Sequence, residues 1–308
     1  MKRAVRVPNR ALHGILLLDK PLGLSSNQAL QAVRRLLRAA KGGHTGALDP
    51  LASGLLPLCF GEATKLAGNL LGARKAYLAE CRLGITTDTG DSEGDLLQRR
   101  SVPALDADAI EAALAKLRGR IAQVPPMYSA LKRDGERLYV KARRGETVDM
   151  PPREVDVHRL ELQAREGDTL RLLVECGSGT YVRSLAVDLG EDLGCGAHLT
   201  ALRRLWVEPF REPRMVTMAE LERAAEQGDE ALLAHLLPVA AGVAGLPAVH
   251  LDEAQSMAIS RGQRIPLPAS LPVGSCVAYA SDGALLALLR LDDERRMHIV
   301  RGFNLPPA

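Results

Sequence analysis

One carboxylate in this sequence lies where it could act as a chemical reagent. Asp49 is followed by Pro50, three glycines lie shortly before it, and the apolar segment 51–60 begins directly after Pro50. An aspartate before a proline in a glycine-rich segment is most often part of a turn, because its side chain bonds nearby backbone and the pre-proline position favours extended geometry. The restricted backbone of such a turn would also hold a nucleophile in place. Local sequence therefore leaves Asp49 as either a turn residue or a reagent.

Several other kinds of reactive site lack their sequence patterns. Residues 177–179 lack the third glycine of a dinucleotide fingerprint, residues 42–44 lack the Lys-Ser/Thr of a phosphate loop, and the chain has no G-x-S-x-G hydrolase elbow. The seven histidines include no i, i+4 pair with a glutamate, so a metal hydrolase is unsupported. The five cysteines are widely spaced without a C-x-x-C, which indicates buried thiols rather than disulfides or a zinc site. By elimination, Asp49 is the strongest candidate nucleophile.

Aromatic residues are scarce, and several lie beside basic residues. Tyr77, Tyr128 and Tyr139 each have basic neighbours, and Tyr181 is two positions from Arg183. Aromatic rings interleaved with Arg and Lys are how proteins hold splayed-out RNA bases and their phosphates. A strand tyrosine such as Tyr77 can equally belong to the core. The pattern suits RNA binding without establishing it.

The composition indicates a globular protein with clustered positive charge. The sequence is 46% hydrophobic and 25% charged, and its 308 residues are enough for one large and one small domain or for two medium ones. The net charge is only +3, but residues 21–46 hold four basic residues and no acid, and residues 132–153 hold seven basic residues against four acids. Such clusters are either solvated faces or contacts for an anionic polymer. No apolar run reaches the length of a membrane span and no signal-peptide core is present, so we expect a cytoplasmic protein without a membrane partner.

Apolar periodicity and capping residues predict the elements that would position these residues. Ser25 and Gln28 form a capping box for a helix, as do Thr217 and Glu220. A strand at 170–176 passes through a glycine turn into a helix that carries Arg183 in its first turn. The remaining predictions are strands at 13–19, 77–83, 275–279, 285–291 and 297–300, helices at 63–71 and 109–117, and a linker at 242–247.

Five collinear blocks of the sequence resemble the TruB family of bacterial tRNA pseudouridine-55 synthases. They are residues 19–26 (DKPLGLSS), 42–66 (GGHTGALDPLASGLLPLCFGEATKL), 75–77 (KAY), 123–145 (QVPPMYSALKRDGERLYVKARRG) and 177–190 (GSGTYVRSLAVDLG). Residues from about 249 to 304 resemble, more weakly, a PUA RNA-binding domain. Ala47 departs from the threonine often found there in relatives, a small change away from the carboxylate.

The resemblance implies an α+β fold: a mixed, largely antiparallel central sheet flanked by helices, followed by a small β-rich domain. It places a catalytic domain at residues 1–247, with an RNA-gripping thumb insertion at 123–153, and a PUA-like domain at 248–308. It also implies a stand-alone, monomeric enzyme whose partner is the T-arm of tRNA, with no cofactor, metal, guide RNA or protein partner.

The resemblance also assigns roles to individual residues. Asp49 would be the nucleophile that isomerises a T-loop uridine, kept ionised by Arg183, while Tyr77 would stack on the flipped uracil. His44 would fill the stack that the uridine leaves. Further family positions are Lys20, Tyr181 and Leu202, which would line the cleft, and Lys132 and Arg143 of the thumb, which would grip phosphates.

Two other interpretations stay open at this point. The chain could be an RNA-binding factor that helps tRNA fold, with Asp49 only a turn residue. It could also be a guide-RNA-dependent relative, although the long block at 123–145 and the short C-terminal region favour the stand-alone form.

Overall fold

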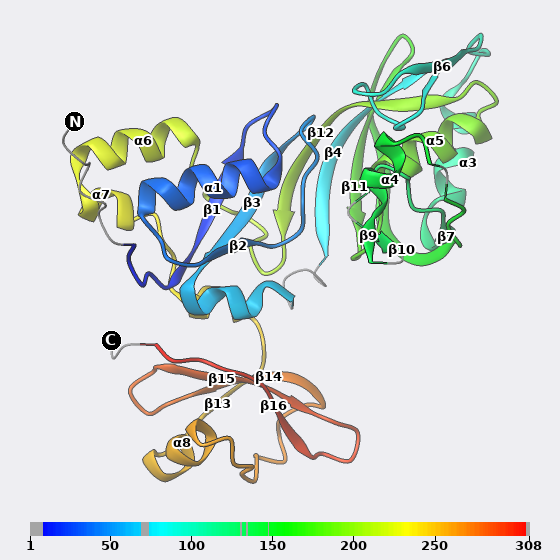
Figure 1. Ribbon diagram of the computed structural model, residues 1–308. Coiled ribbons are helices and arrows are strands. Elements are labelled where there is room, and N and C mark those ends of the chain that lie inside the picture. The colour runs from blue at the N-terminus through cyan, green and yellow to red at the C-terminus, as the bar shows by residue number, and fades with distance from the viewer. Residues whose placement is uncertain (1–8, 69–73, 130, 134, 147, 306–308) are drawn as a thin grey trace, which may run out of the picture.

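The larger part of the protein is built on one mixed sheet (Figure 1). The computed structural model describes residues 9–68, 74–129, 131–133, 135–146 and 148–305. Within them the sheet has eight strands in the order β1-β3-β12-β4-β11-β10-β7, with β2 paired to β3. Neighbouring strands are antiparallel except for β12 and β3, which are parallel. The strands are β1 (Gly14–Lys20), β2 (Gly42–His44), β3 (Ala52–Phe60), β4 (Lys75–Leu83), β7 (Gly119–Gln123), β10 (Arg153–Glu166), β11 (Thr169–Cys176) and β12 (Ala197–Val207).

Helices pack against this sheet at two places. Helix α1 (Ser26–Leu37) lies against β2 and α6 (Met218–Gln227), and α7 (Asp229–Leu233) packs on α6. Helix α5 (Val182–Asp192) packs on β12, and α3 (Ala107–Lys116) on β10. One hydrophobic cluster joins both groups, with Leu16, Val33, Leu172 and Leu189 among its buried members. The predicted fold class, an α+β fold with a mixed and largely antiparallel sheet, is confirmed.

Most predicted elements form where the sequence placed them. Ser25 caps α1 in a reciprocal capping box with Gln28, and Thr217 caps α6 in the same way. The helix expected at 63–71 is wrong in its first half, because Gly61–Leu66 (η1) is a 3₁₀ helix that begins at a glycine with φ +55°. Its last residues, 69–71, lie outside the described part of the chain.

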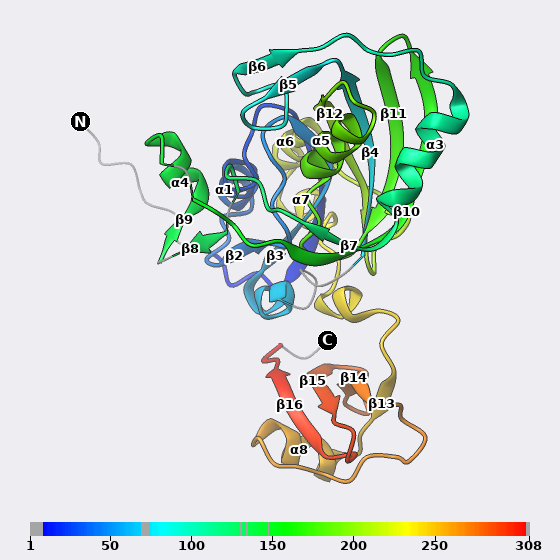
Figure 2. The same cartoon turned by 90° about the vertical axis from the view of Figure 1, so that its right-hand side faces the viewer.

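Two hairpins project from the large sheet region. One is formed by β5 (Ile85–Thr87) and β6 (Leu96–Arg99). The other is formed by β8 (Lys132–Arg133) and β9 (Glu136–Arg137) and continues into α4 (Leu138–Arg143). Figure 2 shows this second hairpin and α4 standing out to one side of the sheet, within the region expected to be a thumb.

The C-terminal region forms a separate small sheet, seen below the larger one in Figure 1. Its strands are β13 (Ala248–His250), β14 (Gly274–Tyr279), β15 (Leu285–Leu291) and β16 (Met297–Gly302), with α8 (Glu253–Ser260) between the first two. The three strands predicted here are confirmed.

The small sheet is packed onto the large one rather than tethered loosely. Leu17 and Leu55 of the large sheet share a buried cluster with Val277 and Leu288 of the small one. The expectation of a plain linker at 242–247 is wrong at its start, because η2 (Val239–Val243) is a 3₁₀ helix whose two valines are buried in that cluster.

Candidate active site

The loop that carries Asp49 connects β2 to β3 and is tied to β3 by backbone hydrogen bonds. The Ala52 N–H donates to the Asp49 carbonyl at 3.0 Å, and the Thr45 N–H donates to the Pro57 carbonyl at 3.1 Å. These bonds make the loop a defined turn, as its sequence predicts. The Asp49 side chain itself is 42% exposed, so its carboxylate faces outward from the turn. The two interpretations of Asp49 are therefore compatible, because the backbone forms the turn while the carboxylate stays available.

Arg183 connects the Asp49 loop to the rest of the site. It is the second residue of α5, and its side chain is only 6% exposed. One terminal nitrogen, Nη2, lies 3.0 Å from Asp49 Oδ2 and donates to the Tyr128 carbonyl at 2.7 Å. The other, Nη1, lies 3.3 Å from Asp91 Oδ2 and donates to the Thr89 carbonyl at 3.0 Å. A guanidinium is suited to this arrangement, because it spreads one charge over a rigid fork of donors.

The groups around Asp49 shift the pKa of its carboxyl in opposite directions. Burial raises the pKa of the Asp49 carboxyl above its ordinary value, and the negative charge of Asp91 adds to this rise. Arg183 opposes the rise most strongly, with a smaller contribution from Lys20. The result is a carboxylate that is more basic than usual and whose ionisation depends on two neighbouring cations. Such a group combines nucleophilicity with partial removal from water.

Tyr77 lies next to the loop on β4, opposite Arg204 of the neighbouring strand β12. Burial raises the pKa of the Tyr77 phenol, and a hydrogen bond with Arg204 works against the rise. Because the net direction is upward from a value near 10, the phenol stays protonated at neutral pH. Tyr77 thus offers a flat ring and a hydroxyl rather than a base.

These residues share a cavity of about 280 Å³, close to the lower end for small-molecule sites. Five of the predicted site residues contribute to its wall: Asp49, Tyr77, Tyr181, Arg183 and Leu202. The rest of the wall is formed by Gly46, Ala47, Leu48, Lys75, Ser129, Gly177, Ser178, Gly179, Thr180, Val182 and Arg204. Segments far apart in the sequence therefore meet around one space whose wall holds one carboxylate, two tyrosine rings and several cations.

Two predicted residues lie close to this cavity without lining it. Lys20 is fully buried, and its Nζ donates to the carbonyls of Pro21 at 2.8 Å and Leu24 at 2.6 Å. Burial lowers the Lys20 pKa to about 8, while the nearby Asp49 partly counters this shift. His44 is half-buried at the end of β2, and burial lowers its pKa. The described part of the structure gives no hydrogen-bond partner to its Nδ1.

The thumb residues are only partly described. Lys132 lies in β8 and Arg143 in α4, while their side chains lie outside what the structure describes. The base of the thumb is well defined and contacts the start of α5. The Gln123 side chain accepts from the Tyr181 N–H at 2.8 Å and donates to the Tyr181 carbonyl at 3.1 Å.

Sequence reasoning missed two charged members of the site. Asp91 is buried, although residues 86–94 look like an ordinary polar turn in the sequence. Arg204 is fully buried and donates to the carbonyls of Gly46 at 3.1 Å and Leu55 at 2.7 Å. Two adjacent arginines in the sequence give no indication that the second of them is buried. For Asp91 the sequence likewise offers only a short polar segment with a glycine, Thr89-Gly90-Asp91, which looks the same as a surface turn.

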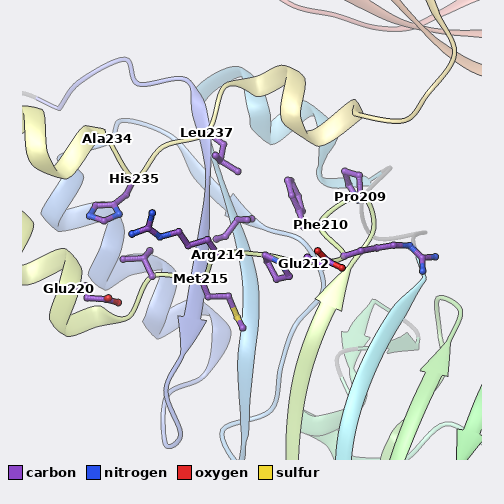
Figure 3. Close-up of a pocket in the computed structure, with 13 residues that line it drawn as sticks. Pro209, Phe210, Glu212, Arg214, Met215, Glu220, Ala234, His235 and Leu237 are labelled. Atoms are coloured by element: carbon purple, nitrogen blue, oxygen red, sulfur yellow. The ribbon is translucent and has the colours of Figure 1, made fainter.

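A larger cavity of about 680 Å³ lies elsewhere, between residues 209–216 and the α6–α7 region (Figure 3). It combines apolar side chains such as Phe210 and Met215 with Arg214 and His235. None of the predicted site residues lines it. Cavity size alone therefore does not select the candidate site, and the Asp49–Arg183 ion pair marks the smaller cavity as the candidate instead.

The described residues contain no group of three or more His, Cys, Asp or Glu side chains placed to hold a metal ion. None of the helices found among them is long and apolar enough to cross a membrane.

Comparison with known proteins agrees with this architecture. Residues 34–182 match the TruB family pseudouridylate synthase N-terminal domain, and residues 183–244 match the tRNA pseudouridylate synthase B C-terminal domain. The tRNA pseudouridine synthase B of Xanthomonas campestris pv. campestris (strain 8004) is 58% identical over 97% of this chain and 96% of that protein. The protein of the same name from Pseudomonas fluorescens (strain Pf0-1) is 49% identical over 94% of each chain.

A solved structure shares the whole fold. The crystal structure of a Cbf5-Nop10-Gar1 complex contains a chain that superposes with a TM-score of 0.74 at 26% identity, covering 96% of this chain and 86% of that one. The sheet and the relatives together define a pseudouridylate synthase. Within that class, the chain belongs to the TruB family.

Proposed function

We propose that this protein converts uridine 55 in the T-loop of tRNA to pseudouridine, with Asp49 as the nucleophile. The observation that carries the proposal is the Asp49–Arg183 ion pair, at 3.0 Å, on the wall of a cavity that also contains Tyr77. The relatives named tRNA pseudouridine synthase B support tRNA as the substrate.

The reaction is an isomerisation, so the site must make and break bonds without adding atoms. The N1–C1′ bond of uridine breaks, the uracil turns, and a C5–C1′ bond forms. The proton on C5 is lost and N1 gains one. Asp49 stabilises the detached state by forming a transient covalent bond, at C1′ or on the uracil ring, and is released unchanged. Either route needs an ionised Asp49, which Arg183 favours.

The cavity suits a base that has left its stack. Tyr77 and Leu202 contribute flat and apolar surface on neighbouring strands, against which a uracil ring can lie. Extruding a nucleotide costs a few kcal/mol, and part of that cost is offset when protein groups occupy the gap in the RNA. We assign this filling role to His44, whose ring is half-buried beside the cavity and whose pKa is lowered by burial, so it stays neutral.

We assign the remaining regions to RNA binding. Residues 1–247 would form the catalytic domain and residues 248–308 a PUA-like RNA-binding domain, in keeping with their separate sheets. The projecting segment within 123–153 would close over the T-arm, with Lys132 and Arg143 contacting phosphates. Tyr181 ties the base of this thumb to the cavity through its bonds to Gln123. No guide RNA or protein partner is needed in this proposal, and the enzyme would act as a monomer.

The test is tritium release from a T-arm minihelix containing [5-³H]uridine, with the purified protein alone. Wild-type protein should release tritium in proportion to pseudouridine formed. Asp49→Asn keeps the shape of the side chain but removes its charge, so release should stop while minihelix affinity is retained.

Asp168→Asn is the matched control. Asp168 is half-exposed and 3.9 Å from Arg82, away from the cavity, so the same chemical change there should leave release unaltered. Turnover by Asp49→Asn would refute the assigned nucleophile and favour a protein in which Asp49 is only structural. Lack of release by wild-type protein alone would instead point to a missing partner.

A further inference from the structure

The backbone on one side of Asp49 is held by a single buried hydroxyl. Ser26 is the first residue of α1 and is 3% exposed. Its Oγ accepts from the Leu48 N–H at 2.7 Å and donates to the Leu48 carbonyl at 3.0 Å. One side chain therefore satisfies both backbone groups of the residue before Asp49, across a separation of 22 positions. Buried backbone groups need such partners, so the contact is costly to lose.

The backbone on the other side of Asp49 is held by the same segment. The Gly23 N–H donates to the Pro50 carbonyl at 2.8 Å. Gly23 has φ +79°, a conformation that suits glycine, and it belongs to the turn whose carbonyls at Pro21 and Leu24 accept from Lys20 Nζ. Gly23 and Ser26 thus form a cradle that fixes both neighbours of Asp49.

This cradle holds the backbone of the loop, whereas the charged residues act on the Asp49 carboxylate. Arg183 contacts the Asp49 carboxylate and acts on its charge, whereas the Ser26 hydroxyl hydrogen-bonds to the backbone of Leu48. The Leu48 side chain is itself buried in the main core, so the hydroxyl joins a fixed point of the core to the loop. A nucleophile must be held close to its attack geometry, since a displacement of about 1 Å can cost roughly 100-fold in rate.

We propose that Ser26 is a positioning residue for catalysis, which sets the placement of the Asp49 carboxylate through the Leu48 backbone. The proposal rests on the function proposed for Asp49. Ser26 does not line the cavity, so it acts without touching the substrate.

The chain offers a matched control in the adjacent residue. Ser25 caps α1, with its Oγ accepting from the Gln28 N–H at 3.3 Å. Among the described residues it makes no hydrogen bond to the Asp49 loop. Ser25→Ala and Ser26→Ala each delete one hydroxyl at the start of the same helix. Both variants should lower the melting temperature, and only Ser26→Ala should change the chemistry.

The experiment measures the single-turnover rate of tritium release, the minihelix Kd and the melting temperature for each variant. Ser26→Ala should lower the rate by about 10- to 100-fold with the Kd unchanged, whereas Ser25→Ala should retain the wild-type rate. Ser26→Thr, which keeps the hydroxyl, should restore most of the rate. Ser26→Cys, with a weak donor and acceptor, should fall between them and provides the test if Ser26→Ala does not fold.

Equal rates for Ser26→Ala and wild type would overturn the proposal, and so would equal losses in the Ser25 and Ser26 variants. Asp49→Asn is measured in parallel to separate the two proposals. If Asp49→Asn is inactive while Ser26→Ala has the wild-type rate, the positioning role alone fails. If Asp49→Asn is active, the proposed nucleophile fails first.

Discussion

Replacing Arg183 should change both the rate and its pH dependence, and the two replacements Lys and Met should do so differently. The guanidinium serves two carboxylates and two carbonyls, with Nη2 assigned to Asp49 and Tyr128, and Nη1 to Asp91 and Thr89. A lysine has one nitrogen on a flexible stem, so it can replace only one half of this arrangement.

The size of the loss follows from the contacts that are given up. A hydrogen bond to a charged group contributes about 1.5–3 kcal/mol. If Arg183→Lys forfeits one such contact to Asp49, and the same energy is lost in the transition state, the single-turnover rate falls by about 10- to 150-fold. Because the Asp49 side chain is 42% exposed, solvent screening favours the lower part of this range.

The pH dependence separates charge from geometry. The proposed mechanism requires ionised Asp49, so the rate should fall as pH drops through the pKa of that carboxyl. Burial raises this pKa and Arg183 is the strongest influence lowering it. Arg183→Met removes the cation and should move the acid limb of the pH–rate profile to higher pH. Arg183→Lys keeps the charge and should lower the plateau with a smaller movement of the limb.

The assay is single-turnover tritium release between pH 5 and pH 9, a range of about two units on either side of neutral pH. Minihelix Kd values measured in parallel show whether a lost rate reflects lost binding. If Arg183→Met lowers the plateau but keeps the wild-type acid limb, Arg183 does not govern the ionisation of Asp49, and the electrostatic reasoning fails.

Two further predictions follow from neighbouring contacts. Lys20→Met should move the acid limb in the same direction but by less than Arg183→Met, because Lys20 ranks behind Arg183 among the groups lowering the Asp49 pKa; an unchanged limb in the same assay would contradict this. Gly54→Ala should destabilise the fold by about 3–5 kcal/mol, because a Cβ at Gly54, where φ is +95°, would lie 2.2 Å from the Arg204 carbonyl oxygen. Urea unfolding measures this loss of folding free energy. Gly119→Ala is the control, because Gly119 has φ +80° but open space around it. Its expected loss is only about 1–2 kcal/mol.

Local signals in the sequence were sufficient for many of the elements. The capping box of Ser25 and Gln28 and the alternation along residues 170–176 are properties of a few neighbouring residues, and both are found as predicted. The first turn of α5, with Arg183, follows from the glycine turn before it. These predictions succeeded because each depends on contacts made within about one or two turns of chain.

Strand β12 shows where local patterns fail. Its two adjacent arginines suggest a solvated basic stretch, yet Arg203 is half-buried and pairs with Asp19, while Arg204 is fully buried. The carbonyls that receive Arg204, at Gly46 and Leu55, are about 150 positions away in the sequence. A buried charge is tolerated only where partners meet it, and those partners are set by the sheet order.

The candidate site likewise combines a loop that local sequence predicts with contacts from distant parts of the chain. Asp49 was identified from its loop, but the contacts that position it come from elsewhere: Ser26 holds the loop, Arg183 faces the carboxylate, and Asp91 holds Arg183 from behind. Asp91 also raises the Asp49 pKa, so it opposes ionisation through its charge while supporting it by orienting the arginine. In the proposed reaction Asp49 loses its negative charge while it is bonded to the substrate. Arg183 then still has Asp91 and the carbonyls of Thr89 and Tyr128 as partners, so the guanidinium stays in place until Asp49 is released as a carboxylate.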